Sequence, residues 1–220
     1  MKEVSLVLGG GGARGLVHIG VIEAVESLGY KIVSISGTSI GAVVGGVYCC
    51  GKLDEYEKWV RSLDRLEVLK FIDPILSSKG FIKGEKIISK IKEIVGDVLI
   101  ENLPYNFTAV ATDLSSEKEF WFNKGSLITA IRASMAIPNI FTPVEVEERL
   151  FVDGGVVNPV PVTPTLQDES DLTIAVSLNG KKCFTPLSSS EEKRKTILEK
   201  ALEYFDSEES EENLFNHFDI

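Results

Sequence analysis

The chain has 220 residues, 44% of them hydrophobic, and a formal net charge of −10 at pH 7. This length predicts a single domain with a substantial core, and the interleaved charges are typical of an ordinary soluble globular protein. The negative balance argues against a nucleic-acid-binding surface, which needs clustered Lys and Arg, and against tight charge-driven adsorption to anionic membranes.

Residues 1–41 alternate between strand and helix patterns. Val4–Leu8 and Lys31–Ser36 are short apolar runs typical of strands, and Ala13–Leu28 between them has helical spacing that ends at Gly29. A further apolar helix is expected up to about Gly51. Strand, helix and strand in this order form a βαβ unit, so we expect the two strands to be parallel and central.

The later segments complete an α/β pattern. Helices are expected over Asp54–Leu66, Gly84–Val95 and Ser126–Ala136, and strands over Phe107–Thr112, Glu119–Phe122, Phe151–Val152 and Leu172–Ser177. Leu69–Phe81 is apolar but broken by serines and glycines, which predicts either a loop packed on the core or a cap over a site.

The sequence shows no targeting, disulfide or membrane-spanning signal. The three cysteines, two of them adjacent at Cys49 and Cys50, form no disulfide framework and have no metal-ligand spacing. Val4–Leu8 is too short for a signal-peptide core, and no stretch approaches the roughly 18–20 apolar residues of a membrane span. We expect a cytoplasmic protein, soluble or peripheral to a membrane.

Gly37-Thr38-Ser39-Ile40-Gly41 lies between a predicted strand and a predicted helix. The G-x-S-x-G pattern at such a junction is typical of a nucleophile elbow, in which glycines allow the sharp turn that exposes a serine hydroxyl. The N-terminus of the following helix favours developing negative charge. A plain tight turn capped by Ser39 is the alternative.

A run of glycines, Gly9–Gly12, follows the first strand. Consecutive glycines leave N–H groups free to converge on an anion, so Gly10, Gly11 and Gly12 are candidate oxyanion-hole donors. Arg14 is a candidate for adding charge or shaping this loop. The stretch also fits the dinucleotide pattern G-x-G-x-x-G, but that site needs an acid at the end of the second strand, where Ser36–Ser39 stand instead.

A serine nucleophile needs a base, and the candidates for a base that would activate Ser39 are the histidines and Asp153. The chain has two histidines. His18 lies among apolar helix residues, and His217 lies near the chain end with little rigid support, although Ser39, Asp153 and His217 do follow the Ser–acid–His order of α/β-hydrolases. Asp153 stands where a strand meets two glycines. Burial beside Ser39 would make its carboxylate basic enough, although Asp-Gly is also a common turn.

Together these residues resemble the patatin-like phospholipases, especially their compact bacterial branch. The similarity follows the family's order from about Lys2 to Asn179, through the motifs Gly10–Gly15, Gly37–Gly41, Ala111–Leu114, Ala133–Pro138, Asp153-Gly154-Gly155 and Asn158–Pro161. Each motif is weak alone, but the linked set is specific.

The resemblance implies a three-layer α/β/α sandwich with a mainly parallel central sheet. It implies hydrolysis of fatty-acyl esters of phospholipids or lysophospholipids through an acyl-Ser39 intermediate, with Asp153 as base and no metal or cofactor. The oxyanion would be held by Gly10, Gly11 and Gly12, with support from Arg14, Gly37, Gly41, Gly154 and Gly155. The alternative is a lipid-binding or regulatory protein that keeps the dyad with negligible turnover.

The resemblance also divides the chain. We expect residues 1–180 to form the catalytic domain and residues 181–220 an acidic tail, in which Asn213–Ile220 looks like the entry into a further helix. Leu69–Phe81 is the candidate acyl-facing cap, with Ile137, Ile140 and Phe141 as further groove walls. The expected partners are a lipid or acyl ester and, transiently, a membrane surface, with no nucleic acid; head group, chain length and oligomeric state stay open.

Overall fold

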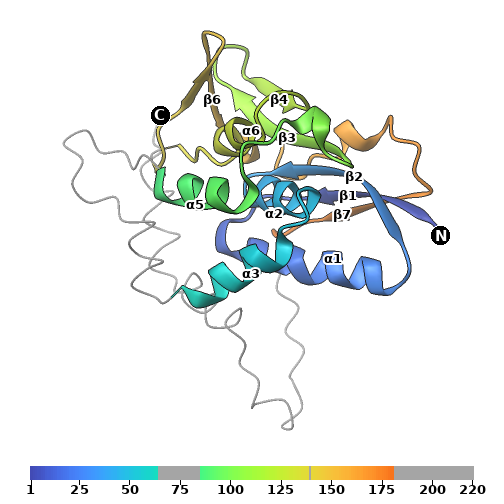
Figure 1. The fold of residues 1–220 in the computed structure, drawn as a ribbon. Coiled ribbons are helices and arrows are strands. Elements are labelled where there is room, and N and C mark those ends of the chain that lie inside the picture. The colour runs from blue at the N-terminus through green and yellow to red at the C-terminus, as the bar shows by residue number, and fades with distance from the viewer. Residues whose placement is uncertain (64–84, 139, 181–220) are drawn as a thin grey trace. The chain divides into compact units, whose positions relative to one another are not determined.

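A seven-stranded sheet forms the centre of the fold (Figure 1). This computed structural model describes residues 1–63, 85–138 and 140–180. Across the sheet the strands are β5 (Val144–Val146), β6 (Arg149–Asp153), β3 (Asn106–Asp113), β2 (Lys31–Thr38), β1 (Glu3–Leu8) and β7 (Leu172–Val176), while β4 (Lys118–Phe122) pairs with β3 off this path. Strands β3, β2, β1 and β7 are parallel, whereas β4 and β6 run antiparallel to β3. The α/β class with a mainly parallel sheet is confirmed.

Five α-helices lie within the described residues. They are α1 (Val17–Ser27), α2 (Ile40–Cys49), α3 (Leu53–Ser62), α5 (Glu85–Val95) and α6 (Leu127–Ser134), and a 3₁₀ turn, η2 (Ile100–Asn102), precedes β3. The helix expected from Ala13 begins instead with a 3₁₀ turn, η1 (Gly12–Leu16). This turn lies against α2: a Cβ on Gly15 would lie only 2.1 Å from the Ile40 side chain.

The two faces of the sheet have different coverings. Helix α2 packs on one face of β2, and the hydroxyls of Ser36 and Thr38 point to the other. Those hydroxyls donate to the carbonyl oxygens of Pro161 and Asn158, so they satisfy backbone groups of residues 154–171 that no regular ladder satisfies. Within the described residues this segment contains only the 3₁₀ turns η3 (Gly154–Val156) and η4 (Thr163–Thr165).

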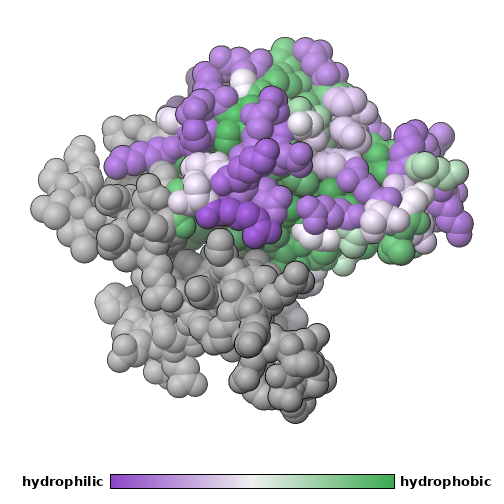
Figure 2. Space-filling view, turned by 60° about the horizontal axis from the view of Figure 1, so that its bottom comes forward, coloured by the Kyte–Doolittle hydropathy of each residue, from purple (hydrophilic) through white to green (hydrophobic). Residues whose placement is uncertain are grey.

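The core lies between the sheet and the helices. Its largest fully buried side chains come from β1, β2, α1, α2, α5, α6 and β6, and include Leu6, Leu8, Ile22, Ile35, Ile91, Leu127, Ile131 and Phe151. On the face shown in Figure 2, hydrophilic residues spread over the described surface with apolar residues between them. No helix in the described part of the chain has the length and apolar character needed to cross a membrane.

Met1–Leu178 form one compact unit. The candidate cap Leu69–Phe81, the tail 181–220 and His217 lie outside the described residues.

Candidate active site

Two strands share one edge of β3, and this arrangement brings the predicted dyad together. β2 pairs with the first part of β3, up to Thr38 opposite Val110, and β6 pairs with the next part, where Ala111 is opposite Asp153. Thr38 and Asp153 are therefore neighbours of consecutive β3 residues, and Ser39 meets the last residue of β6. Although 114 positions separate them, the Ser39 Oγ donates a hydrogen bond to Oδ2 of Asp153 at 2.5 Å.

Ser39 stands in a sharp turn between β2 and α2. Its backbone has φ 55° and ψ −122°, a region that residues with a side chain rarely adopt. The turn depends on close backbone approaches at both flanking glycines. A Cβ on Gly41 would lie 2.0 Å from the carbonyl oxygen of Leu8, and one on Gly37 would lie 2.5 Å from the backbone of Gly41. The geometry is that of a nucleophile elbow.

Asp153 is held by backbone groups where β6 ends. Its N–H donates to the carbonyl oxygen of Ala136 at 2.9 Å, and its Oδ1 accepts the N–H of Gly155 at 2.7 Å. The chain then passes close to β3, because a Cβ on Gly154 would lie 2.1 Å from the carbonyl oxygen of Val110. The two glycines after Asp153 therefore have separate tasks: one orients the carboxylate and the other allows the close approach.

Burial changes the acid–base properties of Asp153. Ser39 and Asp153 are each only 6% exposed. This burial raises the pKa of Asp153, since the charged form loses hydration, while the Ser39 hydroxyl and the Gly155 N–H lower it by a smaller amount. The net direction is upward, so Asp153 is a stronger base than an exposed aspartate.

Ser134 at the end of α6 also contacts the dyad. Its Oγ accepts the backbone N–H of Ser39 at 2.8 Å and donates to the carbonyl oxygen of Val110 at 2.7 Å. In the sequence, Ser134 stands within the family-like stretch Ala133–Pro138 and has no predicted role of its own. A signal was present, because a serine inside an apolar helix needs a hydrogen-bond partner when it is buried.

The glycine loop after β1 lies against Ser39. A Cβ on Gly10 would lie 3.5 Å from that of Ser39, an ordinary van der Waals contact. The Gly10 N–H already donates to the carbonyl oxygen of Pro159 at 2.9 Å, which ties the loop to the segment after Asp153. Within the described residues, the N–H groups of Gly11 and Gly12 donate no hydrogen bond, and the role of the three glycines toward an oxyanion stays a prediction.

Arg14 and His18 both form hydrogen bonds with carbonyl oxygens of this loop. The Arg14 Nε donates to the carbonyl oxygen of Gly11 at 3.4 Å. His18 is fully buried, and its Nε2 lies 2.8 Å from the carbonyl oxygen of Gly9, which requires the proton to be on Nε2. Burial lowers the pKa of His18 and keeps the ring neutral. His18 is thus a packed helix residue, as expected, and its Nε2–H supports the loop.

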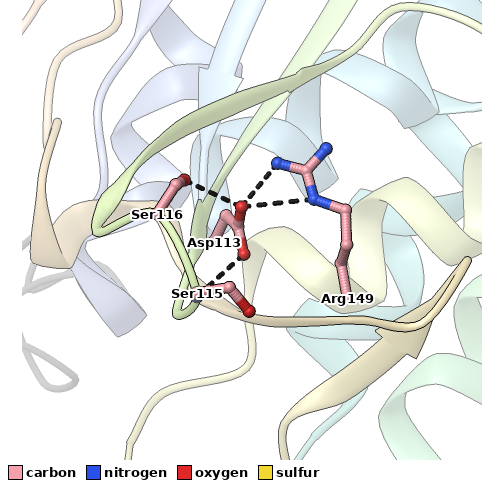
Figure 3. Close-up of polar contacts among 4 residues, drawn as sticks. All are labelled: Asp113, Ser115, Ser116 and Arg149. Carbon is pink, nitrogen blue, oxygen red and sulfur yellow. Dashed lines mark hydrogen bonds and ion pairs between the residues drawn. The ribbon is translucent and has the colours of Figure 1, made fainter.

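An ion pair joins β6 to β3 at the end away from the dyad (Figure 3). Arg149, the first residue of β6, donates through Nε at 3.2 Å and Nη2 at 2.5 Å to Oδ2 of Asp113. The Ser116 hydroxyl at 2.8 Å and the Ser115 N–H at 3.0 Å also bond to this carboxylate. These groups, the Arg149 guanidinium above all, lower the pKa of Asp113 to about 2. The pair adds a side-chain contact between the start of β6 and the end of β3.

An open pocket of about 380 Å³ lies beside that ion pair. Its walls include Phe120, Phe122 and Phe151, with the Arg149 guanidinium stacked 4.6 Å from the centre of the Phe120 ring. Ser39 and Asp153 do not line it. The described residues also contain no group of three or more His, Cys, Asp or Glu side chains placed to hold a metal ion.

Residues 6–166 match the profile of the patatin-like phospholipase family. An uncharacterised NTE family protein of Mycobacterium tuberculosis is 52% identical over 180 residues, which are 82% of this chain and 50% of that protein. Lysophospholipase NTE1 of Kluyveromyces lactis is 32% identical over 195 residues, which are 85% of this chain and 13% of that protein.

Among solved structures, VipD from Legionella pneumophila aligns with a TM-score of 0.49 at 16% identity, over 78% of this chain and 48% of VipD. The chain spans about half the length of the mycobacterial relative and a smaller part of the yeast one.

Proposed function

The chain belongs to the patatin-like phospholipase family, and from that membership we propose that it is a serine acyl-ester hydrolase with Ser39 as nucleophile and Asp153 as base. The family supports lipid hydrolysis as the general activity. The observation that carries the residue roles is the 2.5 Å hydrogen bond between the buried Ser39 hydroxyl and the Asp153 carboxylate.

The first half of the proposed reaction forms an acyl-enzyme. Oδ2 of Asp153 takes the proton of the Ser39 hydroxyl as Oγ attacks the carbonyl carbon of the ester. The carbonyl oxygen becomes negatively charged, and the N–H groups of Gly11 and Gly12 would stabilise it. When the tetrahedral intermediate collapses, the ester bond breaks and the leaving alcohol takes the proton from Asp153.

The second half releases the fatty acid. Asp153 takes a proton from water as the water oxygen attacks the acyl carbon of acyl-Ser39, and the new tetrahedral intermediate uses the same N–H groups. Collapse breaks the bond to Oγ, and the proton on Asp153 returns to the serine. A carboxylate with a raised pKa suits both roles, because it accepts and returns the proton nearer neutral pH.

The proposed substrates are fatty-acyl esters of phospholipids or lysophospholipids. The family and the lysophospholipase name of the yeast relative support this substrate class. Transient contact with a membrane surface and a cytoplasmic location are part of the same proposal, since such a substrate resides in membranes or micelles.

Turnover of a lysophospholipid and of a short-chain nitrophenyl ester by the full chain tests this proposal. Ser39→Ala is expected to abolish turnover of both. Asp153→Asn is expected to lower kcat by about 10²–10⁴-fold, the usual effect of losing a general base, whereas His217→Ala should leave kcat nearly unchanged.

Two other results would redirect the proposal. A loss in His217→Ala as large as that in Asp153→Asn would support a triad. Lysophospholipid binding by the wild-type chain without turnover of either ester would support the lipid-binding alternative.

A further inference from the structure

The last turn of α6 and the residues after it contact both halves of the dyad. Ser134 Oγ accepts the N–H of Ser39 at 2.8 Å, and two residues later the carbonyl oxygen of Ala136 accepts the N–H of Asp153 at 2.9 Å. Neither contact involves the reacting atoms. Both contacts hold the main chain of a residue whose side chain would react. Residues 134–136 therefore support the backbones of Ser39 and Asp153 together.

We propose that Ser134 is a positioning residue, whose hydroxyl holds the main chain of Ser39 in its strained turn and so aligns the Ser39 Oγ with Asp153. This inference rests on the proposed hydrolase function.

A hydroxyl is well suited to this place, because the site requires both an acceptor and a donor. Ser39 is the residue before α2, so its N–H has no partner within that helix, and it is buried. The nearby carbonyl oxygen of Val110 faces the end of β2, where the parallel ladder stops at Thr38. Ser134 accepts from the Ser39 N–H and donates to the Val110 carbonyl oxygen. Its hydroxyl therefore bridges the two chains at the residue that follows the last β2–β3 pair.

The strained backbone makes this support important. A residue at φ 55° and ψ −122° relaxes toward common conformations unless its surroundings hold it. Relaxation would rotate the Ser39 side chain away from a partner at 2.5 Å. A misplacement of about 1 Å can lower the rate by about 100-fold. Loss of the Ser134 hydroxyl should therefore reduce kcat far more than it affects substrate binding.

The test compares Ser134→Ala with Ser5→Ala in the full chain. Ser5 is as buried as Ser134, and its hydroxyl also donates a hydrogen bond, to Ser170 at 2.9 Å, but it does not contact the dyad. Ser134→Ala is expected to lower kcat for the short-chain ester about 100-fold with KM little changed. Ser5→Ala should leave both constants near wild type. Ser134→Cys, which has a weak donor and acceptor of similar size, should fall between and serves if the alanine variant does not fold.

Two further readouts separate positioning from general stability. The acidic limb of the pH profile of kcat/KM should move to higher pH in Ser134→Ala, because a displaced Ser39 hydroxyl no longer lowers the pKa of Asp153. Burial, that hydroxyl and the Gly155 N–H set this pKa, and no charged side chain contributes to it within the described residues. Hydrogen exchange of the Ser39 N–H should be slow in wild type and faster in Ser134→Ala.

The outcomes are distinguishable. Unchanged kcat, pH profile and Ser39 N–H protection in Ser134→Ala would overturn the inference while leaving the hydrolase in place. An inactive wild-type chain would remove the proposed function, and the hydrogen-exchange comparison would still decide whether Ser134 holds Ser39.

Discussion

At the scale of single residues, the burial of Asp153 links its proposed role as a base to the stability of the fold. Its pKa is higher in the folded protein than the ordinary value of 3.8, so the folded state binds the proton more readily than the unfolded chain just above that value. Stability from this group is therefore fully present below pH 3.8 and is lost as the pH rises through the folded-state pKa. At neutral pH the ionised, buried carboxylate makes the folded state less stable.

The upward direction of this pKa shift gives a prediction for Asp153→Asn. The neutral amide has no buried charge, so the variant should melt at a higher temperature than wild type at neutral pH although it is nearly inactive. The difference in Tm should shrink as the pH falls through the raised pKa of Asp153, because the wild-type carboxylate then becomes protonated and loses its charge. Thermal unfolding of both proteins across this pH range is the measurement. A difference that grows on acidification would contradict the direction of the pKa shift.

Single residues also differ in how far the sequence predicts them. Ser39 is recognised from its neighbours, because the glycines on either side and the strand–helix junction are local features. Asp153 is not, since its distance from Ser39 depends on the pairing of β6 with β3, which no local pattern contains. It was predicted from the lack of a suitable histidine and from the family motif. The contact of Ser134 with Ser39 requires knowing where α6 packs.

At the scale of elements, the close contact between the end of β1 and the start of α2 determines the position of the turn at Ser39. Helix α2 can start against the end of β1 only because Gly41 has no side chain. Gly41→Ala should lower the free energy of unfolding by about 1–3 kcal/mol, as overpacking does, and should also reduce turnover, because the displaced helix carries Ser39 with it.

Gly20→Ala is the matched control for this prediction. Gly20 is exposed on α1, and a Cβ there would have no neighbour within 4 Å. It should raise stability by about 0.5–1 kcal/mol through helix propensity, and leave turnover unchanged. Denaturant unfolding and ester turnover of both variants are the measurements. Equal effects of the two substitutions would mean that the close approach at Gly41 has no special importance.

Most elements are predicted by hydrophobic periodicity, and the exceptions have physical reasons. Strand β5 is three residues long, too short for an alternating pattern to be recognised. The β5–β6 turn places Glu147 and Glu148 at positive φ without the glycine or asparagine that normally indicates such a hairpin. Strand β6 extends beyond the predicted Phe151-Val152 at both ends, because Arg149 and Leu150 pair with β5 and Asp153 pairs with Ala111 of β3.

At the scale of the whole molecule, the α/β class follows from the first βαβ unit, but the arrangement that creates the site does not. The site requires that β2 and β6 share one edge of β3, and that residues 154–171 cover one face of the sheet. Both features depend on long-range pairing. The family motifs supply the missing information, because a set of motifs in a fixed order indicates a known strand topology, which hydrophobic periodicity does not.

The most direct test of a Ser39–Asp153 dyad is covalent labelling of the full chain by a fluorophosphonate, with the adduct located by tandem mass spectrometry. We expect one adduct, on Ser39, none in Ser39→Ala, and a labelling rate about 10²–10⁴-fold lower in Asp153→Asn, because the same base activates the serine toward phosphorus and toward an ester. An adduct on another residue, or equal labelling rates in Asp153→Asn and wild type, would contradict the dyad.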